Sequence, residues 1–305
     1  MDVGFSFATI PRAKRQYLRS NALPTIASGF KLANGVTMPC IGLGTWQVPD
    51  DEGLIKAILN AIEIGYRHID TAHIYGNERS VGAAVRTCGI PRSKLFITSK
   101  LWNTDRGYKE TLEAFERTMD ILQLGYLDLF LMHWPCARGE AMTWQSINSG
   151  TWRAMEEIYR QGRVRAIGVS NFLVHHLVPL LARAEVMPMV NQLEFHPGYM
   201  QKPTFDFCRT HGIQVSAWSP LGRGALVHHP VLAEIGAAHS VSGAQVALRW
   251  CLQHGVAAVP KSLNPERQRQ NADLFGFSLS PEEMQRLDDL PQSCFSGLDP
   301  DHVTF

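Results

Sequence analysis

The sequence lacks the features that mark several large classes of protein. No apolar run approaches the roughly 18–20 residues of a membrane-spanning helix, and no apolar N-terminal stretch resembles a secretory signal. Acidic and basic residues almost balance, and the net charge of +1 provides no long-range attraction to nucleic acid or to an acidic membrane. We therefore expect neither nucleic acid nor a membrane as a partner.

Cysteine and glycine motifs are missing as well. The six cysteines are scattered, with no Cys-x-x-Cys pair and no Cys/His cluster, so neither a zinc site nor a disulfide framework is indicated. Reduced thiols and a cytoplasmic location are the simplest interpretation. Gly42-Leu43-Gly44 lacks the third glycine of a Gly-x-Gly-x-x-Gly dinucleotide motif, and no phosphate-binding loop with its lysine occurs.

Residues 1–28 differ in composition from the rest of the chain. They carry Arg12, Lys14, Arg15 and Arg19 against a single acid, Asp2. A basic, acid-poor leader is typical of an organelle transit peptide of the mitochondrial type. We favour the alternative, a disordered or artificially added extension without a targeting role. Residues 29–305 are assigned to one domain.

The pattern from Phe30 onward predicts a hairpin followed by repeated strand–helix units. Asn34-Gly35, between two short apolar runs, is typical of a two-residue hairpin turn. Strands are then predicted at residues 40–43, 67–69, 95–98, 127–132, 164–169, 189–191, 214–217 and 256–259. Helical periodicity lies between them, at 54–62, 112–122 and 152–159, and Ser280 before Pro281 predicts a capped late helix.

This alternation predicts an α/β fold with parallel strands, either a closed (β/α)8 barrel or an open doubly wound sheet. Polar or aromatic residues follow every predicted strand, whereas an open sheet would concentrate them at one switch point. We therefore predict the barrel, with the hairpin closing its bottom. Two long loops, at residues 136–150 and 219–230, are expected to overhang the mouth of the barrel and to select the substrate.

Three successive strand ends carry groups suited to proton transfer. Asp70 ends one strand with Tyr75 five residues later, Lys100 ends the next, and His133 follows the third. A free phenol has a pKa of about 10, which a neighbouring ammonium lowers. Each residue alone has an ordinary structural explanation, but four complementary groups on adjacent strand ends predict an acid–base site at a carbonyl.

The region after the last predicted strand supplies groups for a phosphate. It opens a helix with Lys261, Ser262, Asn264 and Arg267, and a helix N-terminus flanked by cations binds anions. By itself such a segment is most often a solvated surface.

Together these motifs resemble the aldo-keto reductase family from about Phe30 to the end of the sequence. The matching segments are Gly65 to Ala72, Tyr75 to Glu78, Ser99 to Trp102, Met132 to Pro135, Ile167 to Phe172, Asn191-Gln192 and Pro260 to Ser262. The resemblance implies a (β/α)8 barrel that binds NADPH without a Rossmann domain and reduces aldehydes or ketones to alcohols. It also implies that Tyr75 is the general acid, that Lys100 and Asp70 lower its pKa, and that His133 positions the substrate carbonyl.

The resemblance assigns further residues to the cofactor and to the substrate. The nicotinamide would be held by Ser170, Asn171 and Gln192 and stacked on Trp218. Thr45, Trp46 and Asp70 would also contact the cofactor. Ser219, Leu221 and Gly222 would lie along the pyrophosphate. Lys261, Ser262 and Arg267 would hold the 2′-phosphate, and Asn271 would lie near the adenine. Asn264 and Gln270 would also contact the cofactor. Trp46, Val48, Trp102, His133 and Trp134 would form the substrate pocket.

Trp218 and the short tail from Gly297 to Phe305 resemble the prokaryotic and protozoan branch of that family, which includes 2,5-diketogluconate reductases and prostaglandin F synthases. We expect a monomer. One rival interpretation is a metal-dependent hydrolase using His68, Asp70 and His73, on the same barrel. Another is a non-catalytic NADPH-binding accessory or structural protein of the same fold.

Overall fold

The computed structural model describes residues 25–140 and 142–305. Of the N-terminal segment, for which an extension or a targeting role is expected, residues 1–24 lie outside the described residues. In the described part of the chain, parallel strands form one sheet in chain order: β3 (Gly42–Gly44), β4 (His68–Asp70), β5 (Phe96–Leu101), β6 (Leu129–Met132), β7 (Ile167–Ser170), β8 (Val190–Glu194), β9 (Gln214–Trp218) and β10 (Ala257–Ala258).

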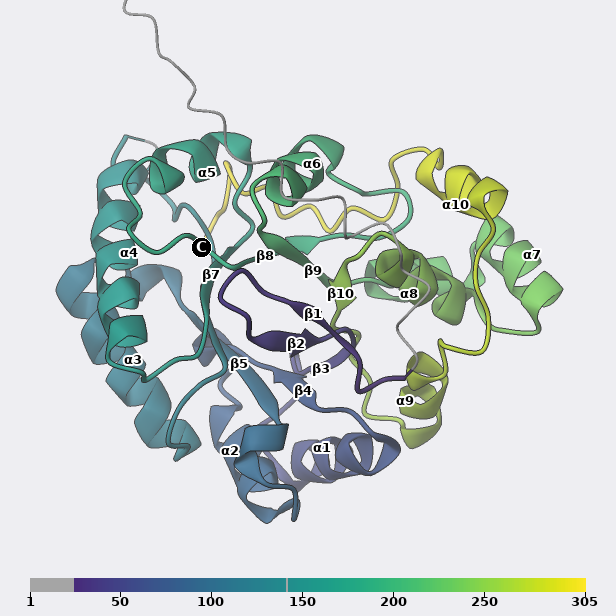
Figure 1. Ribbon diagram of the computed structural model, residues 1–305, viewed down its shortest axis with the longest axis horizontal. Coiled ribbons are helices and arrows are strands. Elements are labelled where there is room, and N and C mark those ends of the chain that lie inside the picture. Colours follow the sequence, from purple (N-terminus) through teal and green to yellow (C-terminus); the bar gives the residue numbers. More distant parts are fainter. Residues whose placement is uncertain (1–24, 141) are drawn as a thin grey trace, which may run out of the picture.

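The sheet closes on itself. A parallel bridge joins Ile41 to Ala258, and the Ala258 N–H donates to the Cys40 carbonyl at 2.9 Å, so the last strand lies beside the first. Figure 1, viewed along the barrel, shows the strands at the centre and the helices around them. The (β/α)8 barrel is confirmed. An open sheet would have left two strand edges unpaired.

The helices follow the strands as the periodicity predicts. The described α-helices are α1 (Glu52–Ile64), α2 (Glu78–Thr87), α3 (Tyr108–Leu122), α4 (Trp144–Arg160), α5 (Val174–Leu181), α6 (Lys202–Thr210), α7 (Pro230–His239), α8 (Gly243–Gln253), α9 (Pro265–Ala272) and α10 (Pro281–Asp288). Short 3-10 turns are η2 (His73–Tyr75), η3 (Arg92–Lys94), η4 (Asn103–Asp105) and η5 (Gly222–His228). The α1 helix buries Leu54, Ile58 and Ile62, and Ser280 caps α10 by accepting from the Glu283 N–H.

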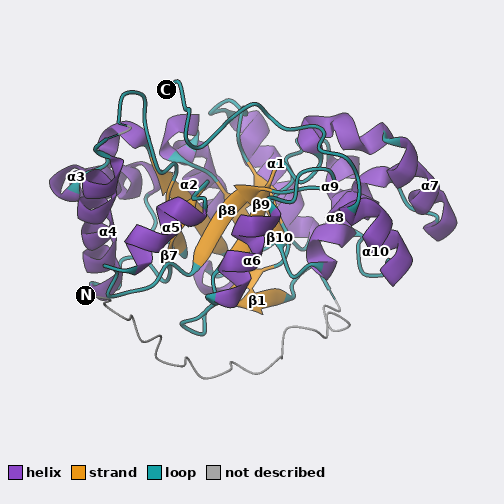
Figure 2. Ribbon diagram, turned by 90° about the horizontal axis from the view of Figure 1, so that it is seen from above, coloured by secondary structure: helices purple, strands orange, loops and turns teal. Residues whose placement is uncertain are grey.

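The N-terminal hairpin pairs β1 (Gly29–Lys31) with β2 (Thr37–Pro39). Its Leu32 and Met38 are buried in one cluster with residues from the barrel strands, which confirms that it closes the bottom, as Figure 2 shows for β1. The predicted two-residue turn is wrong. Leu32 N–H bonds the Val36 carbonyl, and only Gly35 has positive φ, so the loop has three residues with the glycine in the left-handed position.

The predicted loop at 136–150 is shorter than expected. Helix α4 begins at Trp144, so residues 144–150 form its first two turns. Its buried positions there include Asn148, whose side chain donates to the Pro135 carbonyl and accepts from Arg106. Because this buried face is polar, apolar periodicity did not reveal it.

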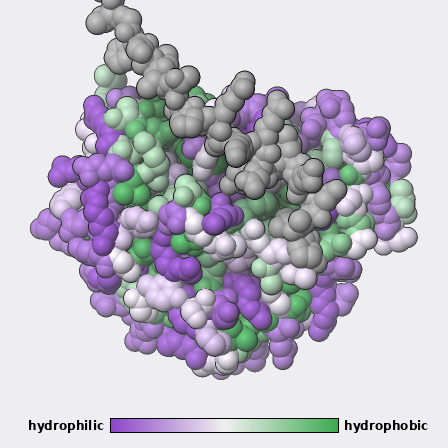
Figure 3. Space-filling view, viewed as in Figure 1, coloured by the Kyte–Doolittle hydropathy of each residue, from purple (hydrophilic) through white to green (hydrophobic). Residues whose placement is uncertain are grey.

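The main apolar cluster contains residues from the barrel strands and from the helices around them. Figure 3 shows hydrophilic residues predominating around the rim of the face seen in Figure 1. Among the described residues, no helix combines the length and the apolar composition needed to cross a bilayer.

Strand β7 has no room for a side chain at Gly168, which yields a stability prediction. A Cβ there would lie 2.5 Å from the Val190 carbonyl oxygen and 2.8 Å from a Leu131 methyl. Gly168→Ala should lower the free energy of unfolding by about 1–3 kcal/mol, because the backbone of a central strand must move. Urea unfolding measures the change. Gly276→Ala, where no atom lies within 4 Å, is the control, and equal effects of the two substitutions would contradict the argument.

Candidate active site

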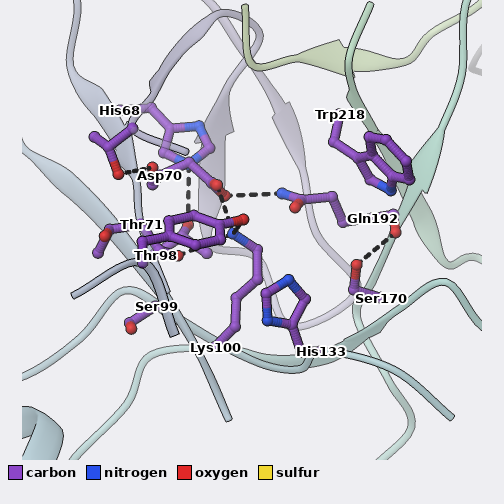
Figure 4. Close-up of polar contacts among 12 residues, drawn as sticks. His68, Asp70, Thr71, Thr98, Ser99, Lys100, His133, Ser170, Gln192 and Trp218 are labelled. Carbon is purple, nitrogen blue, oxygen red and sulfur yellow. Dashed lines mark hydrogen bonds and ion pairs between the residues drawn. The ribbon is translucent and has the colours of Figure 1, made fainter. Parts of the chain in front are cut away.

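The four residues predicted for acid–base chemistry converge at the C-terminal end of the barrel. Asp70 is the last residue of β4, Tyr75 ends η2, Lys100 lies in β5, and His133 directly follows β6. The Lys100 Nζ lies 2.6 Å from the Asp70 Oδ1 and 3.5 Å from the Tyr75 Oη. The ring centroids of Tyr75 and His133 are 5.8 Å apart, with the planes at 72°. Figure 4 shows Asp70, Lys100 and His133 facing one space.

A buried amide holds the segment that carries Tyr75. Asn77 donates to the carbonyls of Thr45 and Val48 at 2.9 Å, and its Oδ1 accepts from the Thr71 hydroxyl at 2.7 Å. Gly76, with φ of 67°, provides the left-handed turn between η2 and this amide. The phenol is therefore fixed from both ends of its loop, and Asn77 is a residue whose role the sequence did not reveal.

Lys100 is a buried cation whose charge is compensated. It is 1% exposed, and besides Asp70 and Tyr75 it donates to the Thr71 carbonyl at 2.9 Å. Burial alone would lower the pKa of its ammonium group. The charges of Asp70 and of the Tyr75 phenolate, with their hydrogen bonds, reverse this and raise the pKa above its usual value. Lys100 is therefore an ammonium at neutral pH.

The pKa of Tyr75 differs from the expectation. Burial raises the pKa of the phenol, Lys100 lowers it, and the negative charge of Asp70 raises it, so the net pKa lies above the usual 10. The predicted direction for Lys100 is right, but that for Asp70 is wrong, because a carboxylate opposes a second negative charge beside it. Asp70 acts on Tyr75 by holding the ammonium in place.

His133 is a neutral imidazole in this site. Burial, and then the nearby Lys100 charge, hold its pKa well below 6.5. Its Nδ1 is buried without a hydrogen-bond partner among the described residues. The Asn171 amide donates to its backbone carbonyl at 3.0 Å and so fixes the backbone that carries the ring.

The residues expected to hold the nicotinamide form one connected row along β7, β8 and β9. Ser170 donates to the Gln192 carbonyl at 2.8 Å, and the Trp218 indole donates to the Asn171 Oδ1 at 2.8 Å. Gln192 reaches across the barrel and donates to the Asp70 Oδ2 at 2.8 Å, as Figure 4 shows. This amide therefore fixes the carboxylate, a contact that sequence spacing does not predict.

Loops after β3 and β9 carry the residues expected near the remainder of the cofactor. Thr45 is buried and donates to the Asp70 carbonyl at 3.0 Å. Trp46 is 36% exposed, and the Arg223 guanidinium lies 5.0 Å from its ring centroid, a contact missed from the sequence. The loop after β9 is sharply turned, with positive φ at Ser219, Gly222, Arg223 and Gly224, and it also contains Leu221.

The predicted phosphate site lies at the start of α9, apart from the four acid–base residues. The Asn264 Oδ1 accepts from the Arg267 N–H at 3.0 Å and caps the helix, and its own N–H donates to the Ser262 hydroxyl. Lys261 and Arg267 are exposed, and neither makes an ion pair with a residue that the structure describes. Gln270 is exposed on the same helix, and Asn271 is buried. Two free cations at a helix N-terminus suit a phosphate.

Aromatic residues line the mouth beside His133. Trp102 meets the His133 ring edge-on with centroids 5.3 Å apart, and Trp134 is buried next to it, while Val48 is buried in the main core. Phe305 stacks on Trp102 at 5.2 Å and meets Trp134 edge-on at 5.4 Å. Phe305 lies beyond the last helix, where no periodicity indicated its position.

The three residues of the rival metal site do not form one cluster. His68 bonds the Thr98 hydroxyl at 2.9 Å, Asp70 pairs with Lys100, and His73 bonds the Glu78 carboxylate at 3.1 Å. Each has a different partner, and among the described residues these three do not form a group whose possible ligand atoms lie within 4.8 Å of one another.

Two curated relatives resemble the chain over nearly all of its length. Glyoxal reductase of Bacillus subtilis is 50% identical over 284 residues, which cover 93% of this chain and 100% of the relative. The 9,11-endoperoxide prostaglandin H2 reductase of Trypanosoma cruzi is 45% identical and covers 89% of this chain and 94% of its own length.

Solved structures resemble it as well. MGS-M4, an aldo-keto reductase from a Medee basin deep-sea metagenome library, has a TM-score of 0.86 at 40% identity and covers 91% of this chain and all of its own. A Gox0644 variant solved in complex with NADPH has a TM-score of 0.83 at 38% identity, covering 90% and 98%. Residues 40–291 match the family described as aldo/keto reductase, and with these relatives the match shows that the chain belongs to the aldo/keto reductase family.

Proposed function

We propose that this protein reduces aldehydes and ketones to alcohols with NADPH, with Tyr75 as the general acid. The observation that carries the proposal is the contact of the half-buried Tyr75 phenol with the buried Lys100–Asp70 pair beside His133. The relatives' names support the reaction type, since they include the glyoxal reductase and the methylglyoxal reductase DkgA of Escherichia coli, which is 39% identical.

The residues of the site suit proton donation in the reductive direction. Because the pKa of Tyr75 lies above 10, the phenol carries its proton at neutral pH, as an acid must. As the proton leaves toward the substrate oxygen, the developing phenolate is stabilised by the Lys100 ammonium, 3.5 Å from the Tyr75 Oη. Neutral His133 can donate one hydrogen bond to the same oxygen and orient the carbonyl.

The residues present fit NADPH. The exposed cations Lys261 and Arg267 at the start of α9 complement the negative charge of a 2′-phosphate, and the Ser262 hydroxyl lies between them in the sequence. The Ser170–Asn171–Gln192 row presents hydroxyl and amide groups beside the half-buried Trp218. When bound, the cofactor would supply the hydride. All these groups come from one chain, so the proposal needs no partner subunit, and we retain a monomer in the cytoplasm as part of it.

The apolar walls of the mouth favour small carbonyl compounds. Trp102 and Trp134 offer aromatic surface beside the His133 imidazole, and Trp46, on the loop after β3, is the third aromatic residue that we assign to this pocket. A non-catalytic NADPH-binding role is the alternative. NADPH oxidation with 4-nitrobenzaldehyde distinguishes the two, since binding without turnover across a broad panel of carbonyls would favour the alternative.

Removing the phenol hydroxyl tests the acid. Tyr75→Phe should lower kcat about 10²–10⁴-fold, because the ring keeps its packing but the proton donor is lost. Steady-state rates with 4-nitrobenzaldehyde measure the effect. Tyr159→Phe, at a half-buried tyrosine near the N-terminal hairpin, is the control and should keep normal rates. Near-normal turnover in Tyr75→Phe would remove Tyr75 from the mechanism.

The cations at the start of α9 should determine cofactor choice. Replacing Lys261 and Arg267 with Ala should raise the Kd of NADPH strongly and leave the Kd of NADH nearly unchanged, because only NADPH carries the 2′-phosphate. Fluorescence titration with each cofactor measures both constants. Arg269→Ala on the same helix is the control, since Arg269 already faces Glu266 at 3.7 Å. An equal rise in the Kd of both cofactors would argue against binding of the 2′-phosphate by Lys261 and Arg267.

The two reaction directions should respond oppositely to pH. Reduction needs the protonated phenol, so its rate should stay level through neutral pH and fall only above about pH 10. Alcohol oxidation needs the phenolate, so its rate should rise as the pH increases toward that value. Initial rates in both directions from pH 6 to 10.5 test this, and a reductive rate that falls between pH 6 and 8 would point to a different acid.

A further inference from the structure

The last ten residues of the sequence, 296–305, cross the mouth of the barrel, and we call them the mouth strap. At one end, Ser296 is tied to Glu194, the last residue of β8, through its N–H at 2.9 Å and its hydroxyl at 2.7 Å. At the other end, Phe305 stacks on Trp102 after β5. Figure 2 shows this end of the chain on the side of the barrel opposite β1. The strap therefore spans the rim beside the acid–base site.

One carboxylate ties the middle of the strap to the barrel. The Asp301 Oδ1 lies 2.7 Å from the His175 Nε2 and 3.0 Å from the His176 Nε2, at the start of α5. Among the described residues, no other side chain of the strap beyond Ser296 forms a hydrogen bond or an ion pair with the barrel. Asp299 and His302 pair with each other at 2.8 Å. Val303, 9% exposed, and Phe305 follow directly after this tie.

The buried histidine is fixed as a hydrogen-bond donor. The His176 Nδ1 accepts the Leu173 N–H at 3.1 Å, so in the neutral ring the Nε2 carries the proton and points it at Asp301. Burial and the neighbouring His175 lower the pKa of His176 to about 4, which keeps the ring neutral at physiological pH. The same tautomer argues against a metal ion among His175, His176 and Asp301, because its Nε2 has no lone pair to offer.

We propose that Asp301 is a positioning residue that latches the mouth strap to His175 and His176 and thereby narrows the substrate mouth. The contact holds Phe305 against Trp102, whose ring in turn meets His133 edge-on at 5.3 Å. Without the latch, the end of the strap keeps one backbone bond, from the Arg138 N–H to the Phe305 carbonyl, the packing of Val303 against Trp134, and a Phe305 that is 39% exposed. The latch favours small carbonyl substrates, and this consequence rests on the proposed reductase activity.

Two substrates with the same reacting group and different bulk test the latch. Methylglyoxal and phenylglyoxal share an aldehyde beside a ketone and differ in a methyl or a phenyl group. In Asp301→Ala, the ratio of kcat/KM for phenylglyoxal to that for methylglyoxal should rise about tenfold, the order expected when a pocket wall moves. The change should appear in KM, with kcat for methylglyoxal nearly constant, because the acid–base residues are untouched.

Control variants separate the latch from a general effect on the strap. His302→Ala removes an exposed imidazole that pairs only within the strap, and its ratio should equal that of the wild type. Asp301→Asn keeps a carbonyl oxygen for the His176 donor and should restore most of the wild-type selectivity. An unchanged ratio in Asp301→Ala, or the same rise in His302→Ala, overturns the proposal.

Hydrogen exchange supplies a measurement that does not depend on turnover. The Arg138 amide, which donates to the Phe305 carbonyl at 3.3 Å, should exchange at least tenfold faster in Asp301→Ala than in the wild type or in His302→Ala, while amides of β5 and β6 keep their protection. Unchanged exchange overturns the latch whether or not any carbonyl is reduced. Faster exchange in a protein that reduces no carbonyl would leave the latch standing and contradict the proposed function instead.

Discussion

The buried ion pair between Lys100 and Asp70 is the interaction on which the site depends. Neither group is stable alone in this position, since an unpaired charge inside a barrel costs several kcal/mol. The pair is held from three sides, by the Thr71 carbonyl on Lys100, by Gln192 on the second Asp70 oxygen, and by the β4–β5 pairing that sets Asp70 beside Thr98. Gln192 lies 122 positions from Asp70 in the sequence, on β8, so the sheet from β4 to β8 must assemble before the carboxylate has all of these partners.

The same pair fits the proposed role of Tyr75 as a proton donor. Burial of the phenol raises the pKa of Tyr75, and the Lys100 ammonium offsets only part of that effect. The result is a phenol that remains protonated in the resting enzyme but has a cation at 3.5 Å when the proton leaves. A reaction is accelerated when the negative charge of the phenolate is stabilised only as it develops. If the phenolate were already stable in the resting enzyme, Tyr75 would have no proton to donate.

Much of the fold and of the acid–base site could be predicted because both follow local rules. The ends of the strands in parallel βα units converge, so the sequence alone predicts that Asp70, Lys100 and His133 lie together. Features that depend on contacts between distant segments could not be predicted from the sequence. The Gln192–Asp70 bond, the Trp46–Arg223 contact and the position of Phe305 have no signature in spacing. The start of α4 has no apolar periodicity because its buried face is polar. The net pKa of Tyr75 could not be predicted because burial and the Asp70 charge raise it while the Lys100 charge lowers it.

The chemistry and the choice of substrate rest on different parts of the molecule. The acid–base residues lie on or beside strands whose hydrogen bonds fix them from several directions, so a change there alters the reaction itself. The residues that we propose for the substrate mouth are Trp46, Trp102, Trp134 and the strap held through Asp301, which lie on loops and beyond the last helix. Such segments tolerate substitution without unfolding the barrel. A relative that is 50% identical can therefore share the reaction and differ in its substrate, and the residues that decide the substrate are to be sought at the rim rather than in the barrel.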